Sequence, residues 1–168
     1  MDGPAHFRQF AAYNAWANTR LYDAAATLSP EELARDCGAF FGSLLGTLNH
    51  LLVGDLIWMS RFDGAGPVPD RLDAILHADL PPLRAARKRE DARIRAYCDG
   101  LTPEQVSGTM TYRTIVNPAE VTQPRAAALA HFFNHQTHHR GQAHALLTHL
   151  GYGAPSFDLL IFQREHDQ

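Results

Sequence analysis

The sequence predicts an all-α fold: a single domain over residues 1–168, built as a four-helix bundle with long crossover connections and short extra helices. Three observations support this prediction. Apolar residues recur at helical spacing in four long segments, and no long stretch alternates apolar and polar residues as a half-buried strand does. A length of 168 residues with 45% hydrophobic and 20% charged residues is typical of one soluble domain with one core.

Each long helix is predicted by its own signals. The first covers about residues 6–28, where an apolar stripe recurs every three or four residues. The second covers about residues 43–62, with Ser43 as the expected N-cap. The third covers about residues 83–97 and stops near a glycine. The fourth covers about residues 122–151, with a proline near its start and a glycine at its end, which is the usual asymmetry of helix termini.

Two short helices are expected where Ser29-Pro30 and Thr102-Pro103 begin, because the hydroxyl caps the helix and the proline fits its first turn. These matching sequences indicate either an internal duplication or two ordinary helix caps. The crossovers follow at about residues 36–42 and 108–121. Residues 109–116 are rich in β-branched side chains and are expected to form a short extended arm or hairpin.

Charge gives no reason to expect a nucleic-acid partner, since the net charge is -3. The densest basic segment, Arg84–Arg95, also contains Glu90 and Asp91 and is expected to be a solvated helix face. The most apolar stretch, residues 40–59, is interrupted by Asn49, His50 and Asp55, which argues against a membrane span.

The N-terminal residues have no basic segment followed by an apolar one, so we expect no secretory signal and a cytoplasmic location. Cys37 and Cys98 are the only cysteines of the sequence. In a reducing compartment they are expected to be free thiols that pack like small apolar residues.

The most informative segment is a histidine-rich part of the fourth helix, in which His135 and His139 lie four residues apart. Residues at this spacing share one helix face, so both imidazoles can reach a single divalent metal ion. His50, isolated in the apolar second helix, is the expected third ligand. His138 and His131 flank the pair, and each stays open as an alternative ligand or as a neighbour of the site.

Gly46 and Gly54 lie one helical turn before and one turn after His50, on the same face. Glycine inside a helix costs about 0.5 to 1 kcal/mol relative to alanine. Two glycines beside the one histidine therefore indicate either that the metal site needs space there or that a neighbouring helix packs closely.

Three neutral imidazoles would leave a divalent ion with its full charge and an open position, where a bound water or thiol loses its proton near neutral pH. No carboxylate is placed by spacing as a general base, because Asp55 lies far around the helix from His50. Gln136 stands where zinc proteases of the HExxH type carry glutamate. A protease of that type is therefore not expected.

Three motifs resemble those of the DinB/YfiT-like family of bacterial metal-binding proteins: Tyr13–Asn18, Gly46–Leu52 and Asn134–Gln142. The resemblance covers essentially the whole chain. It implies an up-down-down-up helix bundle, frequent homodimers, and a divalent metal held by three histidines. By position in these motifs, the histidines are again His50, His135 and His139. The metal implied is nickel or zinc, with iron and manganese as alternatives.

The wider superfamily includes thiol S-transferases and a mycothiol-dependent maleylpyruvate isomerase. The resemblance therefore implies a metal-dependent transferase that activates a low-molecular-weight thiol for attack on a small-molecule substrate. A metal-dependent hydrolase is the alternative enzyme, and a non-enzymatic module with a structural metal is the alternative of another class. For the expected homodimer, His144 and the apolar residues of the first helix are candidates for the contact surface.

Overall fold

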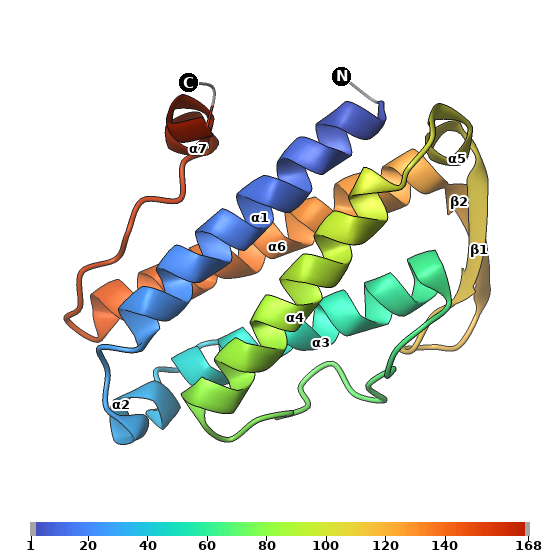
Figure 1. Ribbon diagram of the computed structural model, residues 1–168. Coiled ribbons are helices and arrows are strands. Elements are labelled where there is room, and N and C mark those ends of the chain that lie inside the picture. The colour runs from blue at the N-terminus through green and yellow to red at the C-terminus, as the bar shows by residue number, and fades with distance from the viewer. Residues whose placement is uncertain (1–2, 167–168) are drawn as a thin grey trace.

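The computed structural model describes residues 3–166 and is mostly helical (Figure 1). Its helices and strands follow in the order α1 (Pro4–Ala25), α2 (Pro30–Ala34), α3 (Leu44–Asp63), α4 (Leu80–Asp99), α5 (Pro103–Ser107), β1 (Thr109–Arg113), β2 (Glu120–Pro124), α6 (Arg125–His149) and α7 (Leu159–His166). The mostly helical class is therefore confirmed.

The prediction of an all-α chain is wrong in one respect, because β1 and β2 form a two-stranded antiparallel hairpin. Thr111 faces Thr122 and Tyr112 faces Val121 across this hairpin. β-Branched and aromatic residues favour such pairing, which is the signal that indicated an extended arm or hairpin here. The turn between the strands is held by Thr114, whose hydroxyl donates to the Asn117 carbonyl and accepts from the Ala119 amide at 2.9 Å each.

The four long helices pack side by side in a ring in which α1 contacts α4 and α6, and α3 contacts the same two helices. Figure 1 shows α1 and α6 running in one direction and α3 and α4 in the other. The short helix α2 joins α1 to α3, while α5 and the hairpin join α4 to α6 at the opposite end. Among residues 3–166, no helix combines the length and apolar character that a membrane crossing requires.

The helix ends follow the expected capping chemistry. Ser29 and Thr102 each form a capping box with the side chain three residues later, so both short helices begin where predicted. Ser43 accepts a hydrogen bond from the Gly46 amide at the start of α3. The α3 helix ends at Gly64, whose positive φ of 73° suits glycine.

Two segments were not predicted in their observed form. Residues 64–79 form a long loop that runs back along α3, and Asn49 holds this loop through two hydrogen bonds of 3.0 Å with the backbone of His77. Helix α7 packs against α1 through Phe162, which contacts the ring of Tyr13. Neither segment has a strong repeating pattern in the sequence.

The prediction that Arg84–Arg95 forms a solvated helix face is wrong for three of its charged residues. Arg87, Glu90 and Asp91 are buried. Arg87 forms ion pairs with Asp55 on α3 and with Asp91 one turn later on its own helix. Pairing with Asp55 and Asp91 offsets the cost of burying Arg87, and Glu90 pairs with Arg93 on its own helix.

Together with neighbouring amides, these charges form a buried group that we call the polar core. Asn18 donates to Asp91 at 2.9 Å, and Arg140 donates to Asn14. The members of the polar core are Asn14, Asn18, Asp55, Arg87, Asp91 and Arg140. On each long helix these residues fall between the residues of two large hydrophobic clusters, so the polar core divides the apolar interior into two halves.

Candidate metal centre

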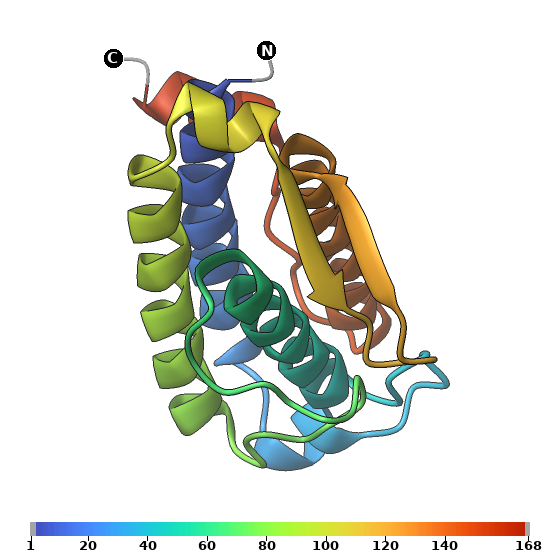
Figure 2. The same cartoon turned by 90° about the vertical axis from the view of Figure 1, so that its right-hand side faces the viewer.

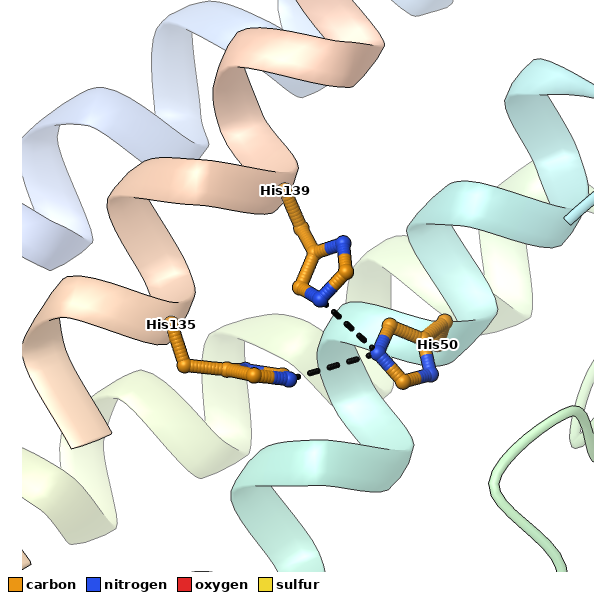
Figure 3. Close-up of side chains that lie close together, drawn as sticks. All are labelled: His50, His135 and His139. Carbon is orange, nitrogen blue, oxygen red and sulfur yellow. Dashed lines mark hydrogen bonds between the residues drawn. The ribbon is translucent and has the colours of Figure 1, made fainter. Parts of the chain in front are cut away.

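Three imidazole rings meet between α3 and α6 (Figure 3). His50 comes from α3, and His135 and His139 come from successive turns of α6. The Nε2 atom of His50 lies 3.3 Å from Nε2 of His135 and 3.1 Å from Nε2 of His139. All three rings offer a nitrogen within 4.8 Å of the others, so the structure brings together the three histidines that the sequence singled out. They form a group that could hold one metal ion.

A side chain at either glycine beside His50 would clash with a neighbour. A Cβ atom on Gly54 would lie 2.8 Å from Cε1 of His135, so a side chain there would displace the imidazole. A Cβ atom on Gly46 would overlap the carbonyl oxygen of Phe41. The Phe41 ring stacks on His50 with centroids 3.8 Å apart. The missing side chain of Gly54 therefore leaves space for the His135 ring. The missing side chain of Gly46 leaves space for the backbone of Phe41, whose ring supports His50.

Hydrogen bonds orient two of the rings. Nδ1 of His50 donates to the carbonyl of Leu72 at 2.7 Å, and Nδ1 of His139 donates to Oε1 of Gln142 at 2.7 Å. With the proton on Nδ1, each neutral ring presents a lone pair at Nε2. This arrangement, in which a metal ligand donates its other ring nitrogen to an oxygen, is usual in protein metal sites.

The donor set fits a cation. The Nε2 lone pairs of His50 and His139 face each other at 3.1 Å, and the tautomers set by Leu72 and Gln142 leave no proton between them. Two facing lone pairs repel, whereas a divalent ion between them would accept both. Nδ1 of His135 is buried and has no hydrogen-bond partner among the described residues, so its ring is held by packing.

Burial favours the neutral form of each ring. It lowers the pKa of His50, although the hydrogen bond to Leu72 acts in the opposite direction. Burial, followed by the neighbouring imidazoles, lowers the pKa of His135 to about 3. Burial also lowers the pKa of His139 to about 4, against the opposing effect of Gln142. At neutral pH all three rings are therefore unprotonated, as metal ligands must be.

The two alternative ligands lie next to the site. His138 is exposed, its Nε2 is 3.3 Å from the Gln142 amide nitrogen, and its ring is 4.7 Å from that of His139. His131 packs its ring against Trp58 at 5.1 Å. Within residues 3–166, no fourth His, Cys, Asp or Glu joins the three histidines to offer a ligand atom. His144 lies away from the group and contacts Phe157.

A pocket of about 770 Å³ opens onto the three rings. Sequence reasoning missed most of its walls, which come from three loops: Phe40 and Phe41 before α3, Asp70 to Asp73 after α3, and Ile115 with Val116 in the hairpin turn. Gln142, which orients His139 but does not line the pocket, had a usable signal because it lies three residues after His139 on the same helix. The loop residues are brought to the site by tertiary structure alone.

The protein is mostly helical, and its three convergent, neutral imidazoles beside an open pocket could hold a metal ion. The chain belongs to the DinB family, whose family model matches residues 1–168. It is similar to Protein DinB of Bacillus subtilis (strain 168), with 23% identity over 158 residues that cover 89% of each chain.

A solved structure shows the same fold. The crystal structure of a DinB-like protein from Bacillus cereus ATCC 10987 matches with a TM-score of 0.68. The match covers 92% of this chain and 97% of that one at 21% sequence identity. At this identity the likeness concerns the fold, and the function has to be argued from the site.

Proposed function

We propose that the protein is a metal-dependent transferase that activates a low-molecular-weight thiol for attack on an electrophilic small molecule. The observation that carries this proposal is the convergence of three Nε2 atoms at the floor of an open pocket with no fourth described ligand. His50, His135 and His139 would hold nickel or zinc, with iron or manganese as alternatives. A divalent ion in such a site lowers the pKa of a bound thiol or water and so supplies a nucleophile at neutral pH.

The protein's own residues would set the geometry of the reaction. The Leu72 carbonyl and Gln142 fix two imidazole orientations, and Phe41 covers one face of His50. In the reaction, the thiol loses its proton to solvent and its sulfur forms a bond to an electrophilic carbon. With a chlorinated acceptor, the carbon–chlorine bond breaks and chloride leaves with the electron pair. With an epoxide, the carbon–oxygen bond opens and the oxygen takes a proton from water.

The pairing of Asp55 and Asp73 supports a thiol over water as the nucleophile. Hydrolysis usually uses a carboxylate to take a proton from the attacking water. Asp55 is fully buried and paired with Arg87, and Asp73 at the pocket mouth is paired with Arg71. Asp70 is the one carboxylate of the described pocket wall that is left for this role, so hydrolysis depends on it. A thiol is acidic enough to lose its proton on binding without such a base. Metal-dependent hydrolysis is the second candidate, and a purely structural metal is the third.

We further propose that the scaffold is a four-helix bundle of up-down-down-up order and that the protein forms a homodimer. The ring of contacts among α1, α4, α3 and α6 and the paired helix directions support the bundle. The dimer rests on the resemblance to the DinB/YfiT-like family, for which homodimers are expected to be frequent. Light scattering over a concentration series tests it, and a single species of 18.6 kDa throughout would exclude a dimer.

The test of the enzymatic proposal is turnover by metal-loaded protein. Bacillithiol, mycothiol, glutathione and cysteine are each offered with a chlorinated aromatic compound or an epoxide, and thioether formation is measured by mass spectrometry. We expect metal-dependent turnover with at least one thiol and none with the His139→Ala variant. Turnover with water but with no thiol would favour the hydrolase. Binding of metal with no turnover in either assay would favour the structural role.

A further inference from the structure

The mouth of the metal pocket is unusually apolar for a solvent-exposed surface. Of the seven large hydrophobic residues that are exposed in the described chain, Phe40, Leu72 and Val116 line this one pocket. Phe40 is 88% exposed and Val116 is 61% exposed. A gathering of exposed apolar side chains around one opening marks a binding site more often than a chance arrangement does.

These residues come from three separate loops. Phe40 lies between α2 and α3, Leu72 between α3 and α4, and Ile115 and Val116 in the turn of the hairpin. Figure 2 shows the hairpin lying alongside α6 and α3, with its turn toward the end of the molecule where the other loops gather. We call Phe40, Leu72, Ile115 and Val116 the apolar rim.

The backbone that carries the apolar rim is held by hydrogen bonds within the chain. In the first loop, the Cys37 amide donates to the Gly42 carbonyl and the Gly42 amide donates to the Ala39 carbonyl, at 2.8 Å each. Asn49 holds the second loop and Thr114 holds the hairpin turn. The rim is thus largely formed before binding, which reduces the ordering that a ligand must impose.

The charges at the pocket mouth disfavour an anion. The charged residues among the described pocket walls, apart from the histidines, are Asp70, Arg71 and Asp73. Arg71 makes two hydrogen bonds to the carboxylate of Asp73, at 3.0 and 2.8 Å, so its guanidinium is already engaged. The remaining carboxylate is that of Asp70. An anionic group would therefore meet no free cation at the mouth.

We propose that the apolar rim binds an uncharged aryl or branched alkyl group of the acceptor that the thiol attacks. This inference rests on the proposed transferase function. The pocket volume of about 770 Å³ is within the range of small-molecule sites. It also exceeds what a small thiol alone would fill, which leaves space for the acceptor between the sulfur and the rim.

An aryl thiol tests the rim without turnover, because its sulfur goes to the metal while its ring occupies the place of the acceptor. We would measure the Kd of benzyl mercaptan, 4-(mercaptomethyl)benzoate and 2-mercaptoethanol from the visible absorption of cobalt-substituted protein. Benzyl mercaptan is expected to bind about tenfold more tightly than 2-mercaptoethanol, since its ring is removed from water. The benzoate should lose most of this advantage because of its charge.

Three serine variants show which residues give benzyl mercaptan its higher affinity. Phe40→Ser and Val116→Ser should each reduce the advantage of benzyl mercaptan by about threefold. Leu160→Ser changes a side chain of similar exposure on α7, outside the pocket, and should leave the advantage intact. Metal content should stay unchanged in all three variants. Equal affinities for the three thiols, or equal effects of the three variants, would overturn the proposal.

A second measurement separates this inference from the transferase proposal. Benzyl alcohol needs no metal, and its binding can be followed through the methyl resonances of Ile115 and Val116. If no thiol binds but benzyl alcohol shifts these methyl resonances, the apolar-rim proposal is supported and the thiol-transferase proposal is contradicted. If these methyl groups do not respond, the rim proposal fails. A change from dimer to monomer in Phe40→Ser would show that the rim is a subunit contact and would also overturn it.

Discussion

His50, His135 and His139 form a group that we call the imidazole cluster. The imidazole cluster and the polar core are two buried polar groups that share helices α3 and α6, but the chain supplies all the interaction partners in only one of them. In the polar core, Arg87 is matched by the carboxylates of Asp55 and Asp91. In the imidazole cluster, like groups face one another and two lone pairs meet without a proton. The chain supplies both the cation and the anions of the polar core. For the imidazole cluster it supplies only the nitrogen lone pairs and no cation that accepts them.

This difference separates stability from function. Because breaking a buried ion pair leaves an uncompensated charge, the polar core should control the free energy of unfolding. The imidazole cluster, which the chain leaves without an acceptor for its lone pairs, should control metal binding.

The largest effect is expected from Arg87→Ala. Removal of the guanidinium leaves Asp55 and Asp91 buried without their cation, which should lower the free energy of unfolding by about 3 to 5 kcal/mol. The folded fraction should still bind metal. Urea unfolding measures the loss, and Lys88→Ala, an exposed neighbour, should stay within about 0.5 kcal/mol of the wild type. A loss below about 1 kcal/mol in Arg87→Ala would contradict the role given to the polar core.

Metal removal should have the next largest effect. At a free metal concentration 100 times the Kd, binding to the folded state alone adds about 2.7 kcal/mol to its stability. We expect a chelator to remove this increment while circular dichroism retains the helical signal. The increment should be absent in His139→Ala. A metal-free protein without helical structure would instead identify the ion as structural.

The pH dependence of the metal-free protein should follow the imidazole cluster. The pKa of His135 is lowered to about 3 in the folded state, whereas an unfolded histidine titrates near 6.5. The stabilisation from a neutral His135 is complete above pH 6.5 and is lost as the pH falls toward the folded value. Between pH 7 and pH 5 this loss is about 2 kcal/mol.

The matched measurement is urea unfolding of wild type and His135→Asn at both pH values. Burial raises the pKa of Asp55 to about 7, so its contribution to stability changes with pH in the opposite direction. That contribution is present in both proteins and cancels in the comparison. An identical pH dependence in the two proteins would show that His135 is not buried in its neutral form.

The smallest effect is expected from Gly54→Ala. The added methyl group would meet Cε1 of His135 at 2.8 Å and turn the ring away from His50. We expect metal affinity to fall about tenfold. Gly141→Ala on α6 is the control, because nothing lies within 4 Å of its added Cβ atom. That change should leave affinity unchanged and stabilise the helix by about 0.5 to 1 kcal/mol. Equal affinities of the two variants would remove the spatial role of Gly54.

The imidazole cluster could be predicted from the sequence, whereas the polar core could not. His135 and His139 share a helix face by spacing alone, and His50 stood out because it was isolated in an apolar segment. The capping boxes at Ser29 and Thr102 were likewise local and placed two short helices correctly. Such features depend on neighbouring residues, so they can be recognised without knowledge of the tertiary structure.

The polar core could not be predicted in this way. Arg87 and Asp91 have the composition of an exposed helix face, and only the approach of Asp55 from another helix explains their burial. The same limit applies to the pocket walls, since Leu72 and Val116 reach the site from loops distant in sequence. Long-range pairing decides these features, and local patterns do not encode it.

We expect His50, His135 and His139 to hold one divalent ion. Elemental analysis of purified wild type, His139→Ala and His144→Ala measures this, because His144 lies on the same helix but outside the group. We predict about one ion per chain in the wild type and in His144→Ala, and a nearly complete loss in His139→Ala. Unchanged metal content in His139→Ala, with the helical signal intact, would contradict the claim.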